Sequence, residues 1–94
     1  MDASSAPLPD LVLYGRVGCH LCDEAHRTLT TLLAERQRDG RPAPGLQVRD
    51  IDTDPAWRSA YSATIPVVEL GDRRLELVTS ATRLRRLLAD VLDA

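Results

Sequence analysis

The feature that most constrains this chain is a short apolar run that leads directly into a long amphipathic pattern. Leu11–Tyr14 is a run of four apolar residues that ends at Gly15, which predicts a short buried strand. A helix is predicted after Gly18, because apolar residues then recur at positions i, i+4, i+7 and i+8. These residues are Ala25, Leu29, Leu32 and Leu33. A strand that feeds a helix in this way predicts the opening βαβ unit of an α/β domain.

Three further strands are predicted downstream, at Leu46–Asp52, Val67–Leu70 and Leu75–Val78. The first of these alternates apolar and polar residues, which is typical of a half-buried strand. Gly71 and Asp72 separate the last two strands and fit a two-residue hairpin loop. We therefore expect the last two strands to pair in the antiparallel sense and the opening pair of strands to be parallel.

Two further helices complete the pattern. Asp54–Pro55 is typical of a helix start, with Asp54 as the N-cap and Pro55 as the first helical residue. The Trp57 and Tyr61 side chains that follow are expected to pack rather than to bind a ligand. The last helix is expected to be capped at Thr79 or Ser80. Its apolar face comprises Leu84, Leu87, Leu88 and Val91. The order β-α-β-(α)-β-β-α predicts an α/β fold with a mixed four-stranded sheet flanked by helices.

The length of 94 residues leaves room for one domain with one modest core. Residues 1–9 include two prolines and neither a basic nor an apolar stretch, so we expect a disordered leader there and not a signal peptide. The domain is expected to span 10–94. No run of the sequence approaches the roughly 18 apolar residues of a membrane span, and we expect a cytoplasmic protein without membrane contact.

The charge balance argues against nucleic acid as a partner. The formal net charge is −2 and the isoelectric point is about 5.6, so the chain has no basic excess. The denser basic stretches, Arg36–Arg41 and Arg83–Arg86, fall on or beside predicted helices. We expect both stretches to be solvated helix faces.

Two cysteines, Cys19 and Cys22, stand at the junction between the first strand and the first helix. A thiol at a helix N-terminus faces unpaired backbone N–H groups and the positive end of the helix dipole. Both favour the thiolate, so the pKa of the thiol is expected to fall below the ~8.5 of a free cysteine. We expect Cys19 to be exposed and to attack, and Cys22, one helical turn on, to resolve a mixed disulfide.

The same Cys-x-x-Cys pattern is also half of a zinc site. Zinc takes four ligands, and the chain has no second pair of cysteines. His20 and His26 are the other soft donors, and His20 lies between the two cysteines. We therefore expect that the two cysteines bind no metal. The alternative is that they belong to a module that binds a metal ion or an iron–sulfur cluster.

The residues on both sides of the dithiol, together with a later tripeptide, resemble a known family. The segment from Leu11 to Cys22, followed by Asp-Glu-Ala, and the downstream Thr64–Ile65–Pro66 are similar to the glutaredoxin branch of the thioredoxin superfamily, and to its short glutaredoxin-like proteins in particular. This resemblance implies a thioredoxin/glutaredoxin-like fold. It also implies a cis Pro66 that packs against the dithiol, a Thr64 that lines the groove, and an Ile65 whose backbone N–H and C=O are free to pair with an extended thiol substrate.

The resemblance raises the question of glutathione. Arg16 stands where glutaredoxins commonly carry Lys, and it is expected to lower the thiol pKa, to hold a glutathione carboxylate, or to be a solvated loop residue. Typical glutaredoxins have Gly-Gly followed by Asp before the last helix, whereas this chain has Val78–Thr82 there. Thr79 and Ser80 still offer backbone N–H groups to a carboxylate, but the acidic partner for the glutathione amine is missing.

The sequence therefore predicts a monomeric thiol–disulfide oxidoreductase that requires no cofactor. Its substrate would be a protein or low-molecular-weight disulfide, and its reductant would be glutathione or a thioredoxin-type protein. The remaining alternative is a thioredoxin-fold adaptor with little turnover, since members of such families can lack the expected activity.

Overall fold

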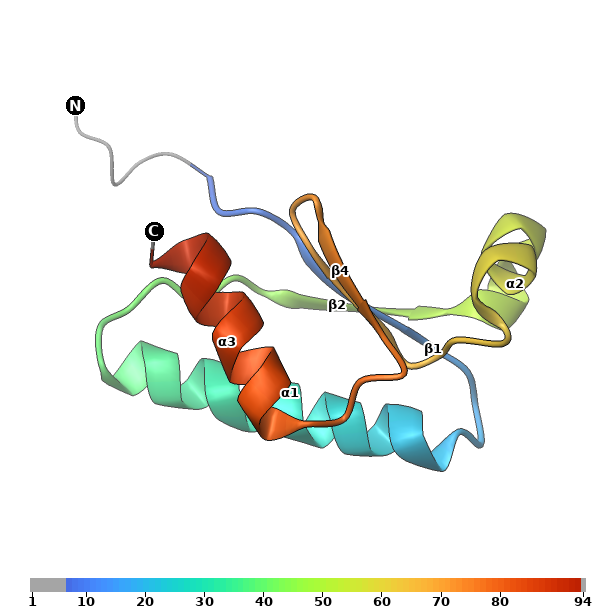
Figure 1. Cartoon of the computed structure of the whole chain (residues 1–94), viewed down its shortest axis with the longest axis horizontal. Coiled ribbons are helices and arrows are strands. Elements are labelled where there is room, and N and C mark those ends of the chain that lie inside the picture. Colours follow the sequence, from blue (N-terminus) through green and yellow to red (C-terminus); the bar gives the residue numbers. More distant parts are fainter. Residues whose placement is uncertain (1–6, 94) are drawn as a thin grey trace.

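The structure, a computed structural model, describes residues 7–93. Within this range the elements are β1 (Leu11–Gly15), α1 (His20–Arg38), β2 (Leu46–Asp50), the 3-10 turn η2 (Ile51–Thr53), α2 (Pro55–Tyr61), β3 (Val67–Leu70), β4 (Arg73–Glu76) and α3 (Ala81–Leu92) (Figure 1). The predicted order β-α-β-α-β-β-α is confirmed. Of the expected leader 1–9, residues 1–6 lie outside the described part of the chain.

The four strands form one mixed sheet in the order β2-β1-β3-β4. β1 pairs with β2 in parallel and with β3 in the antiparallel sense, and β3 and β4 form an antiparallel hairpin, as predicted. Tyr14 pairs with Val67, so the next residues along, Gly15 and Pro66, bring the end of β1 beside the start of β3. α1 begins at the same end of the sheet, shortly after the end of β1 (Figure 1).

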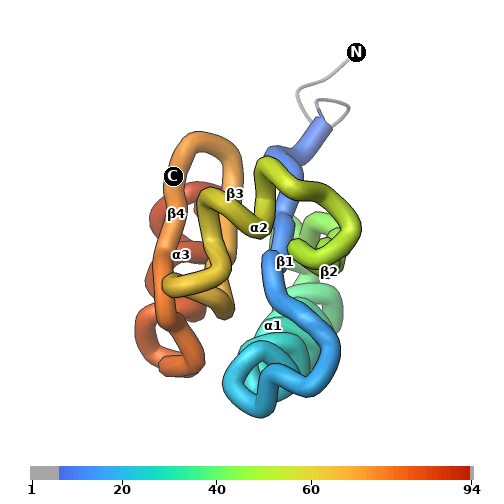
Figure 2. Tube along the Cα trace, turned by 90° about the vertical axis from the view of Figure 1, so that its right-hand side faces the viewer, coloured from blue at the N-terminus to red at the C-terminus, as the bar shows by residue number. Residues whose placement is uncertain are grey.

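One face of the sheet carries the main core, which is aliphatic throughout. α1 and α3 cover this face and lie against each other, as both views show (Figures 1 and 2). The predicted apolar faces of both helices lie in this core, with Val91 at its margin. The opposite face carries a smaller cluster of Val12, Tyr14, Ile51 and Val67, against which Trp57 and Tyr61 pack.

The last strand begins earlier than the sequence predicts. β4 spans Arg73–Glu76 and not Leu75–Val78, because the two-residue loop at Gly71–Asp72 pairs Leu70 directly with Arg73. The chain then leaves the ladder at Leu77, whose φ of +52° lies in the left-handed region. Its N–H donates to the Thr64 C=O over 2.9 Å, which ties this bend to the segment before β3.

β2 is shorter than predicted and lies at an edge of the sheet. The predicted strand Leu46–Asp52 ends at Asp50, whose carboxylate accepts from the Asp52 N–H at 2.9 Å and so caps η2. Val48 on β2 is 58% exposed, although the alternating pattern predicts a buried side chain there. An edge strand receives cover from only one neighbouring strand, and sequence alternation does not reveal this.

The caps of the two shorter helices follow their sequence signals. The Asp54 carboxylate accepts from the Ala56 N–H at 2.8 Å, and Pro55 is the first residue of α2. Of the two candidates for the cap of α3, Ser80 is the N-cap, and its hydroxyl accepts from the Arg83 N–H at 3.2 Å. No helix within residues 7–93 is long and apolar enough to cross a membrane.

The prediction of a solvated face at Arg36–Arg41 is wrong for Arg36, which is only 5% exposed. Its Nε donates to the Pro42 C=O at 2.6 Å, and its guanidinium is paired with the Asp93 carboxylate beyond the end of α3. Arg36 thus joins the end of α1 to the loop that follows it and to the end of the chain.

Candidate dithiol site

Cys19 and Cys22 are joined as a disulfide at the start of α1, with their Cα atoms 5.2 Å apart. Cys19 is the N-cap of the helix, and its Sγ accepts a hydrogen bond from the Cys22 N–H at 3.1 Å. The sulfur therefore takes the place that a Ser, Thr or Asp oxygen takes at other helix starts. A backbone donor aimed at Sγ is the kind of interaction that stabilises negative charge on sulfur.

The loop between β1 and α1 determines how far each sulfur is exposed. Gly18 has a φ of +83°, a conformation that glycine adopts readily, and the Cys19 N–H donates to the Arg16 C=O at 3.2 Å. This turn leaves Cys19 partly exposed, whereas Cys22 is 5% exposed. The predicted order of exposure is confirmed.

Two apolar side chains flank the exposed sulfur. Val17 is 88% exposed and Leu21 is 52% exposed, one on each side of Cys19 in the chain. Single exposed apolar residues are common on protein surfaces. Here the two border the residue expected to attack a substrate.

The sequence predicts Gly15 only as the end of a strand. A Cβ at this position would lie 2.9 Å from the Cys22 Cβ and 3.1 Å from its Sγ. The missing side chain lets Cys22 pack directly against the end of β1. A glycine between a buried strand and a Cys-x-x-Cys turn is the sequence signal that could have identified this contact.

Arg16, expected near the thiolate or a glutathione carboxylate, is paired with a carboxylate of the chain itself. Its Nη2 and Nε donate to the two Asp52 carboxylate oxygens at 2.7 and 3.1 Å. Arg58 contributes a second cation, with its Nε 3.3 Å from Asp52 Oδ1. The hydrogen bond with Arg16 lowers the pKa of the Asp52 carboxyl below its usual value and raises the pKa of Arg16.

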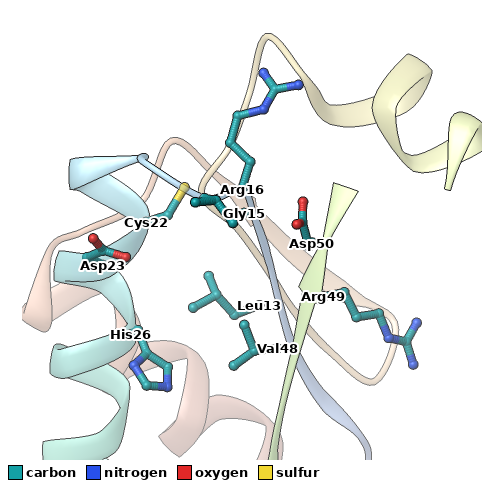
Figure 3. A pocket seen from close by; sticks show the side chains of 10 residues that line it. Leu13, Gly15, Arg16, Cys22, Asp23, His26, Val48, Arg49 and Asp50 are labelled. Atoms are coloured by element: carbon teal, nitrogen blue, oxygen red, sulfur yellow. The ribbon is translucent and has the colours of Figure 1, made fainter. Parts of the chain in front are cut away.

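A cavity of about 250 Å³ opens beside Cys22, between the start of α1 and the end of β2. Figure 3 shows Leu13 and Val48 at its floor, with Asp23 and Asp50 on either side. Sequence reasoning did not find this cavity, because it forms where an edge strand and a helix diverge. The residues that line it are Leu13, Gly15, Arg16, Val17, Cys22, Asp23, His26, Val48, Arg49 and Asp50.

The predicted Thr64–Ile65–Pro66 segment directly precedes β3. It lies at the end of the sheet where β1 leads into the dithiol. The Ile65–Pro66 bond is cis in this structure, and Pro66 is buried. The expectation that both backbone groups of Ile65 are free is wrong for the N–H, which donates to the Tyr61 C=O at 3.1 Å. This bond forms because residues 62–64 make a turn after the end of α2, in which the Thr64 N–H also donates to the Tyr61 C=O at 2.9 Å.

The remaining predicted site residues do not line the cavity. Thr79 is half-buried, and the Ser80 hydroxyl is engaged as the cap of α3. His20 is exposed beside Cys19. Within residues 7–93 no group of three or more His, Cys, Asp or Glu side chains is arranged to hold a metal ion.

Behind the dithiol, the other face of β1 carries a polar cluster around Glu69. Tyr14 and Tyr61 donate their hydroxyls to the two Glu69 carboxylate oxygens at 3.3 and 3.2 Å. Burial, with the nearby Glu69 carboxylate, raises the pKa of Tyr14 above its usual value. Arg49 lies over the Trp57 ring, 5.4 Å from its centroid, which places the Arg49 guanidinium with this cluster.

Comparison with known proteins agrees with this geometry. A model of the glutaredoxin-like domain (DUF836) matches residues 10–92. None of the curated proteins matches the chain significantly.

Three solved structures resemble the chain along most of its length. The crystal structure of target protein XcR50 from X. campestris is 35% identical, covers 85% of this chain and 96% of its own, and has a TM-score of 0.67. The solution structure of XcR50 is also 35% identical, covers 86% and 94%, and has a TM-score of 0.65. The solution structure of protein Ne2328 from Nitrosomonas europaea is 29% identical, covers 77% and 78%, and has a TM-score of 0.57. With its thioredoxin fold and its Cys19–Cys22 pair, the chain belongs to the glutaredoxin-like domain (DUF836) family.

Proposed function

We propose that this protein is a thiol–disulfide oxidoreductase in which Cys19 is the nucleophile and Cys22 the resolving residue. The reduced Cys19 thiolate attacks one sulfur of a substrate disulfide, forms a Cys19–substrate disulfide and releases the other sulfur as a thiolate. The Cys22 thiolate then attacks Cys19 Sγ and displaces the second substrate thiolate. The substrate gains two electrons and the protein is left with the Cys19–Cys22 disulfide.

The observation that carries this proposal is the position of Cys19 Sγ at the N-cap of α1, 3.1 Å from the Cys22 N–H. A thiolate is the reactive form, and a backbone donor together with the helix dipole stabilises it. The same helical turn holds the two Cα atoms 5.2 Å apart, within the range of about 4.4–6.8 Å that a disulfide requires. Nucleophile and resolving thiol are thus brought together by one turn of helix.

Supporting roles follow for the residues around the dithiol. We assign the Ile65 C=O as an acceptor for a backbone N–H of the substrate, since the Ile65 N–H is already bonded to Tyr61. Thr64 and Pro66 would form the wall of the same groove. Glutathione or a thioredoxin-type protein would return two electrons to the Cys19–Cys22 disulfide. The α3 N-terminus after Thr79 and Ser80 would receive a glutathione carboxylate if glutathione is the donor.

Substitution of each cysteine tests this mechanism. Cys19→Ser should reduce turnover of a dialkyl disulfide at least ~10³-fold, because no other thiol can take the attacking position. Cys22→Ser should retain the attack and accumulate a mixed disulfide on Cys19, which intact-mass measurement after acid quench would detect. Activity in Cys19→Ser equal to that of the parent would contradict the proposal. Thiols of the parent that neither oxidise nor alkylate, with bound metal in the preparation, would favour a metal-binding module.

A further inference from the structure

The cavity beside Cys22 adjoins the proposed reaction centre but plays no part in the exchange steps themselves. Its volume of about 250 Å³ lies below the roughly 300–1,000 Å³ of sites for drug-sized ligands and cofactors. It is therefore of a size for one side chain. Because Val17 and Cys22 both line it, a substrate residue next to the attacked cysteine can reach it.

The floor of the cavity is apolar. Leu13 is 1% exposed and Val48 is 58% exposed, so one wall belongs to the core and the other is open at the sheet edge. Gly15 lines the cavity where Cys22 packs against the end of β1. A hydrocarbon chain placed on this floor would cover exposed apolar surface, which is favourable at roughly 25 cal/mol per Å².

The opening of the cavity carries acidic groups. Asp23 from α1 and Asp50 from β2 flank it from two sides, and His26 also lines it, three residues after Asp23 on the helix (Figure 3). Two cations also belong to the lining, but their charges are directed elsewhere. Arg16 is bound to Asp52 at 2.7 Å and turns away from the cavity (Figure 3).

Arg49 is the second of these cations. Its Nη2 donates to Gln47 Oε1 at 2.9 Å, and its guanidinium stacks over Trp57 on the far side of β2. The cavity therefore combines an apolar floor with an acidic opening. Within residues 7–93 neither the Asp23 nor the Asp50 carboxylate forms a direct ion pair, although the Arg16 charge is near enough to Asp50 for the two to attract each other.

We propose that this cavity selects the substrate: it binds a side chain with an apolar stem and a cationic head, Lys or Arg, beside the substrate cysteine. The inference rests on the proposed oxidoreductase and adds its substrate class, a protein disulfide with basic neighbours. Glutathione carries two carboxylates and one amine, so the same opening disfavours it.

The test uses the reduced full-length protein and three capped peptides, Gly-X-Cys-X-Gly, with X as Lys, norleucine or Glu. Each peptide cysteine is disulfide-bonded to a chromogenic aryl thiol. Attack by the Cys19 thiolate on the peptide sulfur releases the aryl thiolate, whose absorbance gives the rate. Cys22 then displaces the peptide thiolate and closes the Cys19–Cys22 disulfide. Each rate is divided by that of the same peptide with neutral 2-mercaptoethanol, which removes intrinsic differences in reactivity.

We expect the normalised rate for the Lys peptide to exceed that for the Glu peptide about tenfold at low salt, with norleucine between them. The double variant Asp23→Asn, Asp50→Asn should reduce this ratio to about twofold. Glu24→Gln removes a neighbouring charge of α1 that does not line the cavity, and it should keep the ratio. Val48→Trp, which fills the cavity from its open edge, should slow the Lys and norleucine peptides alike.

A neutral substrate without a side chain, the mixed disulfide of 2-mercaptoethanol with the same aryl thiol, separates the two proposals. If the protein reacts with it and reacts equally with all three peptides, the cavity does not select basic neighbours and this inference is overturned alone. A ratio that Glu24→Gln reduces as much as the double variant also overturns it. If neither the neutral disulfide nor any peptide reacts, the oxidoreductase itself is wrong.

Discussion

At the end of α1, Arg36 is 5% exposed and is bonded to Pro42 and Asp93, whereas at the start of the same helix Val17 and Leu21 lie open to solvent beside Cys19. The first arrangement joins the end of α1 to the loop that follows it and to Asp93, 57 residues further along the chain. The second leaves a disulfide accessible and a cavity beside it. We call the end of α1 at Arg36 the fastened end and, after the exchange proposed for Cys19, the start of α1 at Cys19 and Cys22 the reactive end. The two ends should respond differently to substitution.

The largest expected effect on stability is at the fastened end. Arg36→Ala removes the bonds to Pro42 and Asp93 and a buried side-chain stem, and it should lower the free energy of unfolding by about 2–3 kcal/mol. Urea unfolding followed by circular dichroism measures this loss. Arg38→Ala, an exposed position in the last turn of α1, should change it by less than about 0.5 kcal/mol.

The rate at which reduced Cys19 is alkylated should remain unchanged in Arg36→Ala under folding conditions. A clear change in this rate would mean that the two ends of α1 are coupled, and the comparison between them would fail. Equal stability of Arg36→Ala and Arg38→Ala would instead mean that the buried ion pair contributes nothing net.

A smaller effect is expected at the reactive end. In Gly15→Ala the new Cβ would meet Cys22 atoms at 2.9 and 3.1 Å, so the helix start or the strand end must shift. Overpacking of this kind costs about 1–2 kcal/mol, and here it should also slow disulfide exchange because it displaces Cys22. Gly45→Ala is the matched control, since a Cβ there has no neighbour within 4 Å. Equal stability and exchange rates in the two variants would show that Cys22 does not need the space.

The two ends also differ in how well the sequence predicted them. The dithiol, its helix and the order of exposure of the two sulfurs follow from local signals, because a strand, a glycine turn and a helix start are adjacent in the chain. The pairing of Arg16 with Asp52 spans 36 residues and that of Arg36 with Asp93 spans 57. Neither leaves a local signal. Arg16 was therefore expected beside the thiolate, at a glutathione carboxylate or in a solvated loop, and Arg36 on a solvated helix face.

The left-handed bend at Leu77 and the exposure of Val48 escaped prediction for a related reason. Each depends on which strand lies next to which, and not on the residue pattern of its own segment. The cavity beside Cys22 is the consequence on which the proposed substrate selection depends. It exists because β2 is an edge strand that leaves Val48 uncovered next to α1.

The smallest expected effect concerns acid. An arginine-paired carboxylate with a shifted pKa lies at each end: the hydrogen bond with Arg36 lowers the pKa of Asp93, and that with Arg16 lowers the pKa of Asp52. A carboxyl whose pKa is lower in the folded state stabilises the fold above its unfolded pKa of about 3.9. That stabilisation is lost as the pH falls through the lower, folded pKa. The parent should therefore lose stability below about pH 4.

Asp93→Asn should reduce the loss of stability at low pH more than Asp52→Asn does. The reason is that Arg36 is almost fully buried, whereas the Arg16 side chain is 33% exposed and screened by water. The urea midpoint measured at intervals from about pH 2 to 7 gives the slope for each variant. Asp72→Asn in the exposed hairpin loop controls for the loss of one negative charge. If Asp52→Asn flattens the slope as much as Asp93→Asn, the reactive end is held by its ion pair as firmly as the fastened end. Arg16 would then be a structural residue first, and its release toward an anionic substrate would require breaking that pair.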